Sequence, residues 1–286
     1  MQYNDNAQLD SSQMGGGGGG GGGRIAIGGG IGGTILILIL SLVFGVDLSG
    51  LTGGGSTSAD PQAETSRYSQ CRTGADVRTN RDCRFVAYTN SIQQYWSTQV
   101  KGYETTKTIT FTGRISTGCG TADSSVGPFY CPAQGDHKVY LDTGFFDQLQ
   151  SQFGARGGDA AEAYVIAHEY GHHVSNLLGK MDWAAQDRST GPNSRGVKIE
   201  LQADCFAGAW LAHASDDPNS PITQVTQDDV NRALDAAAAV GDDRIQQKSQ
   251  GQVTPETWTH GSSQQRQQAT TTGFQSGPNA CLQITQ

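Results

Sequence analysis

A dense group of metal-binding residue types lies between residues 164 and 176, which read YVIAHEYGHHVSN. Three of the six histidines of the chain and one of its six glutamates fall within six consecutive positions there. His168, Glu169 and His172 fit the pattern H-E-x-x-H, in which two histidines four residues apart lie one above the other on a helix and can bind one zinc ion. Glu169 is then placed to take a proton from a zinc-bound water. Without a metal, two buried imidazoles and a carboxylate would need other partners.

Local signals predict that this stretch is helical. Asp159 and Glu162 have the spacing of a capping box, and Gly179 is suited to the C-terminal end of a helix. We therefore expect a helix over residues 160–178, with the H-E-x-x-H pattern inside it.

A second, mostly apolar helix over residues 197–214 offers the rest of a metal site. Glu200 and Asp204 are four residues apart and share one face of it. If this helix faces the first, Glu200 can supply the third protein ligand that a catalytic zinc needs, and Asp204 can accept a hydrogen bond from a ligand imidazole. Cys205 lies about 140° around the helix from Glu200 and should point away from the metal.

Hydrophobic periodicity and turn residues predict the remaining elements. Alternating, β-branched stretches indicate two strands, and apolar residues at helical spacing indicate three more helices. The expected strands are 107–115 and 137–142, and the expected helices are 83–100, a short one that begins at Asp142 and ends at Gly154, and one from Thr226 to Gly241.

The N-terminal part divides by composition into three segments before one globular domain at 67–286. Residues 1–24 are polar and Gly-rich, which predicts disorder. Residues 25–46 carry no charge and are long enough for a transmembrane helix, although their apolar end could instead belong to a cleaved signal peptide. Residues 47–66 are rich in Gly, Ser and Thr and predict a flexible linker. Arg24 favours a single-pass anchor in the cell membrane with the N-terminus in the cytoplasm.

All six cysteines follow the apolar segment, as expected of an extracytoplasmic domain in an oxidising compartment. Fifteen pairings are formally possible, and the preferred set joins Cys71 to Cys83, Cys119 to Cys131 and Cys205 to Cys281. The net charge of −8 and the thinly spread Lys and Arg argue against a nucleic-acid partner. The oligomeric state does not follow from the sequence.

Several segments together resemble the bacterial neutral zinc metallopeptidase family typified by the YpfJ proteins. They are AYVIAHEYGHHVSNLLG, ELQADCFAGAW, CGTADSSVGPFYCPA with the following VYLD, VGDDRIQ with THGSSQQR, and a tail, Gly-rich stretch and span that end in SLVFGVD. The resemblance implies a membrane-anchored, zinc-dependent peptidase in which His168, His172 and Glu200 bind zinc, Glu169 is the general base and Asp204 orients a ligand. The chain departs from the family pattern at Ser175 and in RQQATTTGF, which affects packing and substrate contacts but no metal ligand.

We therefore expect an α+β, gluzincin-like domain, mostly helical with a small sheet, behind one transmembrane helix. One Zn²⁺ per chain would activate water for attack on a peptide or protein substrate, which an edge strand of the sheet could align. His260 is the candidate that stabilises the oxyanion, with Arg266, Tyr170 and Tyr164 as rivals. Two other interpretations remain open: a metal-dependent amidase that acts on the cell wall, and a non-catalytic envelope scaffold with a structural zinc or none.

Overall fold

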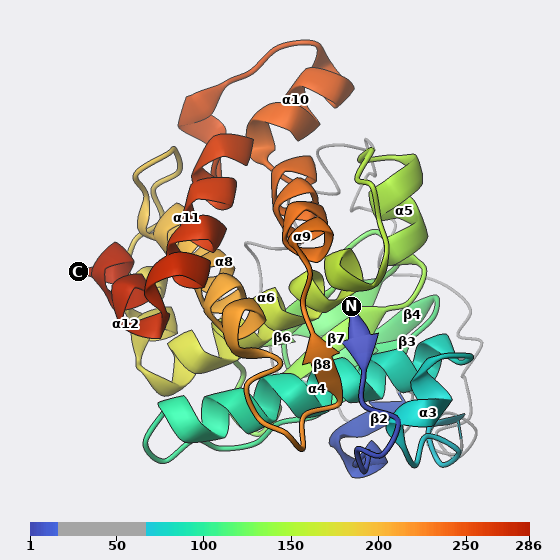
Figure 1. Cartoon of the computed structure of the whole chain (residues 1–286). Helices are drawn as coiled ribbons and strands as arrows, with labels where there is room; N and C mark the ends of the chain where they lie inside the picture. The colour runs from blue at the N-terminus through green and yellow to red at the C-terminus, as the bar shows by residue number, and fades with distance from the viewer. Residues whose placement is uncertain (17–66) are drawn as a thin grey trace.

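Helices surround one small mixed sheet in the computed structural model, which describes residues 1–16 and 67–286 (Figure 1). The sheet has four strands in the order β2, β3, β7, β6, in which β3 runs parallel to both of its neighbours and β6 runs antiparallel to β7. Strand β6 is therefore an edge strand. The bounds of the four strands are Met14–Gly16 for β2, Thr108–Phe111 for β3, Phe129–Cys131 for β6 and Lys138–Asp142 for β7.

The single strand expected over residues 107–115 is two strands in different sheets. Strand β3 ends at Phe111, and β4 (Arg114–Thr117) pairs with β5 (Gly120–Asp123) in a separate hairpin. Gly113 lies between β3 and β4 with a φ of +78°, a left-handed conformation that turns the chain out of the first sheet. The boundary between the two strands is therefore this glycine. The alternating pattern continues across it and does not indicate the break.

The five helices expected from the sequence are all present, with ends that differ from prediction by a few residues. They are α4 (Arg81–Gln99), α5 (Phe145–Ser151), α6 (Asp159–Leu177), α8 (Arg195–His213) and α9 (Gln227–Ala239). The predicted capping box of α6 is wrong, because Gly158 is the N-cap and Glu162 pairs with Arg81 instead, at 2.8 Å. Gly179 follows the end of α6 with a φ of +70°, as expected of a C-terminal stop.

Further elements complete the fold and were not predicted. The longest are α10 (Asp242–Gln250) and α11 (Ser263–Ser276), and the shorter ones include α3 (Gly74–Val77), α7 (Lys180–Ala185), α12 (Pro278–Cys281), η4 (Pro255–Thr257) and η5 (Leu282–Thr285). Helix α11 has a capping box between Ser262 and Gln265, a signal that is visible in the sequence. Its threonines and glycine hide the helical period, so the apolar pattern alone does not reveal it.

The expected disorder of residues 1–24 is wrong for residues 1–16, which pack against the domain. Strand β1 (Gln2–Tyr3) pairs with β8 (Ile222–Gln224), η1 (Ser11–Gln13) follows, and β2 extends the central sheet beside β3. The Tyr3 hydroxyl donates a hydrogen bond to Asp159 at 2.7 Å, and the side chain of Met14 is 3 % exposed. Polar composition predicted disorder, but strand pairing and one buried methionine supply enough contacts to order this segment.

The expected transmembrane helix at 25–46 and the linker at 47–66 lie outside the described residues. In the part of the chain that the structure describes, no helix is both long and apolar enough to cross a membrane. The mixed class of helices with a small sheet in a single domain is confirmed.

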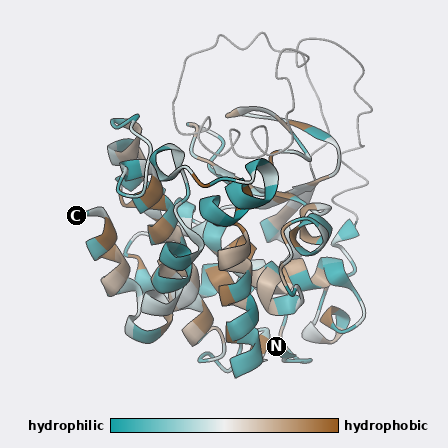
Figure 2. Ribbon diagram, turned by 90° about the horizontal axis from the view of Figure 1, so that it is seen from above, coloured by the Kyte–Doolittle hydropathy of each residue, from teal (hydrophilic) through white to brown (hydrophobic). Residues whose placement is uncertain are grey.

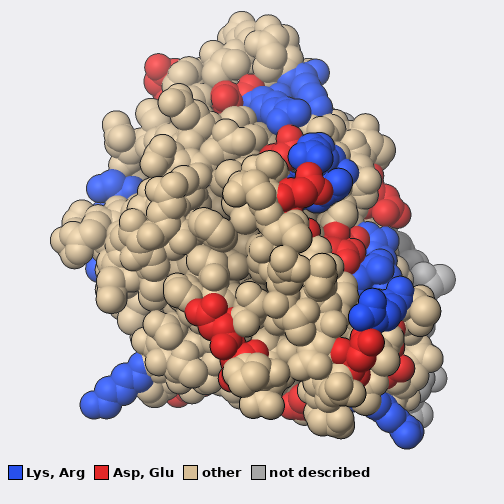
Figure 3. Space-filling model, viewed as in Figure 1, with Lys and Arg blue, Asp and Glu red and all other residues tan. Residues whose placement is uncertain are grey.

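Hydrophobic residues alternate with hydrophilic ones along the helices in Figure 2, and the buried ones form a large core between α4, α6 and α8. In that core the rings of Trp96 and Phe206 meet edge to face with centroids 5.1 Å apart. On the surface, acidic and basic side chains intermix down one edge of the face in Figure 3. Ion pairs such as Arg232 with Asp228, at 2.7 Å, show how such charges pair locally.

All three preferred disulfide pairings are confirmed. Cys71 bonds to Cys83, Cys119 to Cys131, and Cys205 to Cys281. The third joins α8 to α12, so Cys205 takes part in a disulfide and not in the metal site. The second ties the β4–β5 hairpin to strand β6.

Helices α8 and α11 pack closely because glycines face each other across the contact. A β-carbon at Gly208 would overlap the carbonyl oxygen of Thr270, and one at Gly273 would overlap the carbonyl oxygen of Cys205. Only glycine allows two helix backbones to approach this closely.

We predict that Gly208→Ala lowers the free energy of unfolding by about 1–3 kcal/mol or more, because the added methyl group forces α8 and α11 apart. The matched control is Gly196→Ala in the first turn of the same helix, where the nearest atoms to a β-carbon are 3.8 Å away. That substitution should change stability by less than about 1 kcal/mol. Urea denaturation of both variants tests the packing, and equal stabilities would contradict it.

Candidate metal centre and catalytic cleft

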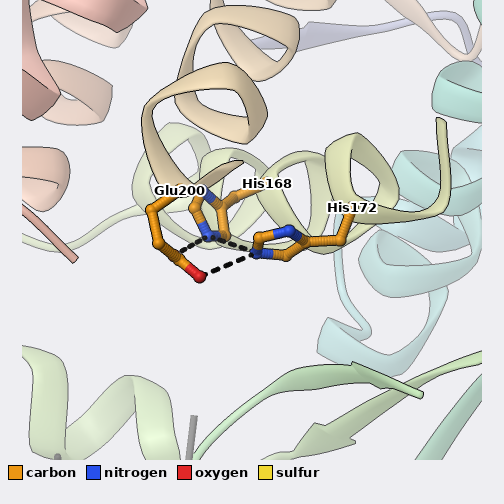
Figure 4. Close-up of side chains that lie close together, drawn as sticks. All are labelled: His168, His172 and Glu200. Atoms are coloured by element: carbon orange, nitrogen blue, oxygen red, sulfur yellow. Dashed lines mark hydrogen bonds and ion pairs between the residues drawn. The ribbon is translucent and has the colours of Figure 1, made fainter. Parts of the chain in front are cut away.

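His168, His172 and Glu200 converge on one point, although they come from two helices (Figure 4). The Nε2 atoms of the two histidines are 3.2 Å apart. The Glu200 carboxylate lies 3.2 Å from Nε2 of His168 and 3.5 Å from Nε2 of His172. All three side chains are buried, at 6 %, 1 % and 3 % exposure respectively. The three residues predicted as metal ligands are thus brought together.

The spacing of these atoms fits a tetrahedral metal. Zinc binds histidine nitrogen at about 2.0–2.1 Å, so two nitrogens at a tetrahedral angle are separated by about 3.3 Å. The observed separation of the two histidine nitrogens, 3.2 Å, agrees with that value, and the two oxygens of Glu200 lie 3.2 Å and 3.5 Å from these nitrogens. Two imidazole nitrogens and one carboxylate also form a donor set typical of catalytic zinc.

Gly171 lets the two helices approach closely enough to form this cluster. It lies on α6 between the two histidines, and a β-carbon there would be 2.8 Å from Cα of Ala203 on α8. Any larger residue would push α8 away and carry Glu200 with it. The glycine of HEYGH therefore has a packing role that the motif alone does not state.

Asp204 orients His168, as the helical spacing predicted. Its Oδ1 accepts a hydrogen bond from Nδ1 of His168 at 2.8 Å, which leaves the lone pair of Nε2 directed at the cluster. Burial by itself lowers the pKa of His168, but Asp204 and Glu200 together outweigh burial and raise it to about 10. Burial by itself also raises the pKa of Glu200, but His172 and His260 lower it well below its usual range. The negative charges of Asp204 and Glu200 therefore favour a cation at the point where the three side chains converge.

Arg266 neutralises Asp204 from the opposite side. Its Nε donates to Oδ2 and its Nη2 donates to Oδ1, both at 2.8 Å, and the hydroxyl of Tyr164 also bonds to Asp204. Burial raises the pKa of Asp204, but Arg266 and His168 together more than offset this and hold it below its usual range. Arg266 and Tyr164, both considered as oxyanion donors, instead hold the carboxylate that orients His168.

Glu169 lines a cavity beside the three ligands. The cavity encloses about 650 Å³, open mouth included, and His168, Glu200, His260 and Glu169 share its wall. Glu169 is 4 % exposed, and its Oε2 has no hydrogen-bond partner among the described residues. Burial raises the pKa of this carboxyl, the direction that suits a base working near neutral pH.

His260 also reaches the cavity with one ring nitrogen unpaired. Its Nδ1 lies 2.8 Å from the hydroxyl of Thr259, and its backbone N–H donates to Asp242 at 2.7 Å. Nε2 is buried without a hydrogen-bond partner among the described residues. Burial lowers the pKa of His260, so the ring is neutral at pH 7 and Nε2 can carry a proton to donate.

Other residues considered from the sequence lie outside this centre. The Tyr170 hydroxyl bonds to Thr108 in the core at 3.0 Å, which removes it as an oxyanion donor. His173 faces away from the ligands, with Nε2 2.7 Å from the carbonyl oxygen of Glu104. The sequence missed the role of Arg266 because α11, which carries it, was not predicted. The capping box at Ser262 was the available signal.

Comparison with known proteins agrees with this geometry. The sequence model of the family described as "Putative neutral zinc metallopeptidase" matches residues 2–283. The chain belongs to this family. Within the neutral zinc metallopeptidases it is similar to the uncharacterized protein Rv2575 of Mycobacterium tuberculosis (strain H37Rv), at 48% identity over 84% of each chain. It is also similar to the uncharacterized protein YpfJ of Escherichia coli K12, at 40% identity over 88% of this chain and 85% of YpfJ. No solved structure matches the chain at a significant level.

The family resemblance expected from the sequence is thereby confirmed. The match spans the segments that carry His168, Glu169, His172 and Glu200. Membership of a zinc metallopeptidase family and the convergence of three buried ligands independently indicate a metal site at this point.

We predict that the purified full-length protein carries about one metal ion per chain and that His168→Ala abolishes it, because two ligands remain where three are needed. His213→Ala is the control, since His213 is exposed, lies outside the cluster, and contacts Asp216 at 2.6 Å and the ring of Tyr95. Elemental analysis of both variants and the wild type gives the result. Equal metal content in all three would contradict the assignment.

Proposed function

We propose that this protein is a zinc-dependent peptidase that hydrolyses peptide bonds, with a gluzincin-like arrangement of its two metal-binding helices. One observation carries the proposal: Glu169 lies in the wall of a cavity whose other wall residues include His168 and Glu200 of the ligand cluster. A structural metal site has no need for an unpaired, buried carboxylate beside it.

His168, His172 and Glu200 would hold the zinc ion, which when bound supplies Lewis-acid activation of water and of a carbonyl oxygen. Glu169 accepts the proton of the attacking water at its unpaired Oε2 and delivers it to the leaving amine. Asp204 keeps His168 in the tautomer that leaves Nε2 free. The proton transfers thus depend on the buried carboxylate of Glu169. The orientation of the ligand His168 depends on the buried carboxylate of Asp204.

His260 is the proposed oxyanion donor. Of the four candidates, Tyr170 is bonded in the core, and Tyr164 and Arg266 are bonded to Asp204. His260 Nε2 alone among them has no hydrogen-bond partner among the described residues. A neutral imidazole N–H there could donate to the negative charge that develops on the carbonyl oxygen.

Strand β6 is proposed to align the substrate main chain. Among the described residues it pairs with β7 alone, and it follows directly on Gly127 and Pro128, which line the cavity. An extended peptide could add to its free edge and place a peptide bond near Glu169.

Replacement of Glu169 by Gln should lower peptidase activity by about 10²–10⁴-fold, because the amide cannot accept the proton, while metal content stays unchanged. Hydrolysis of fluorescently labelled casein and of a mixed peptide library measures activity, and elemental analysis measures the metal. An active variant would contradict the mechanism. Wild-type cleavage of cell-wall muropeptides but not of proteins or peptides would favour the amidase.

We also propose that residues 1–16 and the domain lie on the same, extracytoplasmic side of the cell membrane. Three disulfides support an oxidising compartment for the domain. Residues 1–16 pair with β3 and β8 of that domain, so both ends of the segment 17–66 belong to one folded body. A single crossing by residues 25–46, with the N-terminus in the cytoplasm, cannot coexist with this packing in one molecule.

Cysteine labelling on intact cells tests this arrangement. Asn6→Cys is an exposed site in the N-terminal segment, and Ser97→Cys is an exposed site in the domain. A membrane-impermeant maleimide should label both variants if they share one side. Labelling of Ser97→Cys alone would show that the N-terminal segment lies across the membrane from the domain.

A further inference from the structure

We propose that the cavity beside the metal centre binds one large apolar side chain of the substrate, of leucine or phenylalanine size, next to the bond that is cleaved. The inference rests on the proposed function, because it names the substrate class for the same site. Further support comes from the part of the cavity wall that lies away from the candidate metal ligands.

That wall is apolar and is assembled from separate parts of the chain. It includes Phe145 of α5, Phe153 after that helix, Val165 of α6, Val240 after α9, and Ile245 of α10. Five apolar side chains from elements distant in sequence form a surface that would hold an apolar group and exclude water from it.

The wall residues keep a small exposure that their neighbours in the core lack. Phe145 is 8 % exposed, whereas Phe146, the next residue of the same helix, is 1 % exposed. Val165 is also 8 % exposed, whereas Ile166 beside it is 0 % exposed. In each pair one side chain completes the core and the other faces the cavity.

The guanidinium in the cavity wall is already paired, so it is not free to bind an acidic substrate side chain. The Arg266 guanidinium bonds to Asp204 through two nitrogens, and its Nη1 donates to the carbonyl oxygen of Val240 at 3.3 Å. Glu200 belongs to the ligand cluster. An acidic substrate side chain would therefore lose its hydration against Phe145 and Ile245 without gaining a partner, which is costly.

The apolar part of the cavity adjoins the residues proposed to act on the substrate. Glu169 and His260 lie in the same wall as the apolar residues. A side chain seated in the apolar part would thus hold the neighbouring peptide bond near the groups proposed to act on it.

The test uses N-acetyl amino-acid hydroxamates, whose head group binds zinc and whose side chain is varied. Binding to the zinc-loaded full chain is measured by calorimetry for the glycine, leucine, phenylalanine and aspartate compounds. Leucine and phenylalanine should bind about 10- to 100-fold more tightly than glycine, the gain expected from burying one such side chain. Aspartate should bind no better than glycine.

Ile245→Ala should reduce the ratio of leucine to glycine affinity by several-fold while the glycine affinity stays unchanged. Val253→Ala is the matched control, because Val253 is 40 % exposed and lies outside the cavity wall. It should leave the ratio at its wild-type value.

The outcomes separate the two proposals. Equal binding of the glycine, leucine and phenylalanine compounds would overturn the apolar pocket and leave the metal centre intact. Failure of every hydroxamate to bind would overturn the proposed zinc-dependent function, and the substrate class with it. Tighter binding of aspartate than of leucine would also overturn the inference.

Discussion

The close approach of α8 to the helices on either side of it is the constraint on which the rest of the structure depends. The missing side chain of Gly171 allows α8 to pack closely against α6. The missing side chains of Gly208 and Gly273 allow α11 to pack closely against α8. The first contact brings Glu200 to the histidines of α6, and the second brings Arg266 to Asp204. The candidate metal centre and the Asp204–Arg266 pair that supports it therefore both include a residue of α8. A shift of α8 would disturb both.

Electrostatics then explains how so many polar groups can be buried at this place. Asp204 accepts from His168 and Arg266, so its charge is compensated on two sides. Buried charges without partners are strongly destabilising, and this network leaves Asp204 fully bonded. Glu169 Oε2 and His260 Nε2, by contrast, are buried without a hydrogen-bond partner among the described residues, and both residues line the cavity. Two polar groups of the cavity wall are thus left for contacts with water or substrate.

Packing of residues 1–16 against the domain changes how the whole chain must be arranged. The first strand pairs with β8 and the second extends the central sheet, so the N-terminal segment is part of the domain and not a separate tail. Composition gave no sign of this, because disorder is inferred from low hydrophobicity, and the contacts here rest on backbone pairing and a few side chains such as Tyr3 and Met14.

Local spacing in the sequence identified the candidate metal ligands, because two histidines four residues apart on a helix must share a face, and the same holds for Glu200 and Asp204. Local signals also predicted five helices, and an even cysteine count predicted a disulfide framework. Only the tertiary structure decided that Arg266 supports Asp204 and that five apolar residues form one cavity wall. Each of these depends on residues far apart in sequence meeting in space, and no local pattern encodes such a meeting.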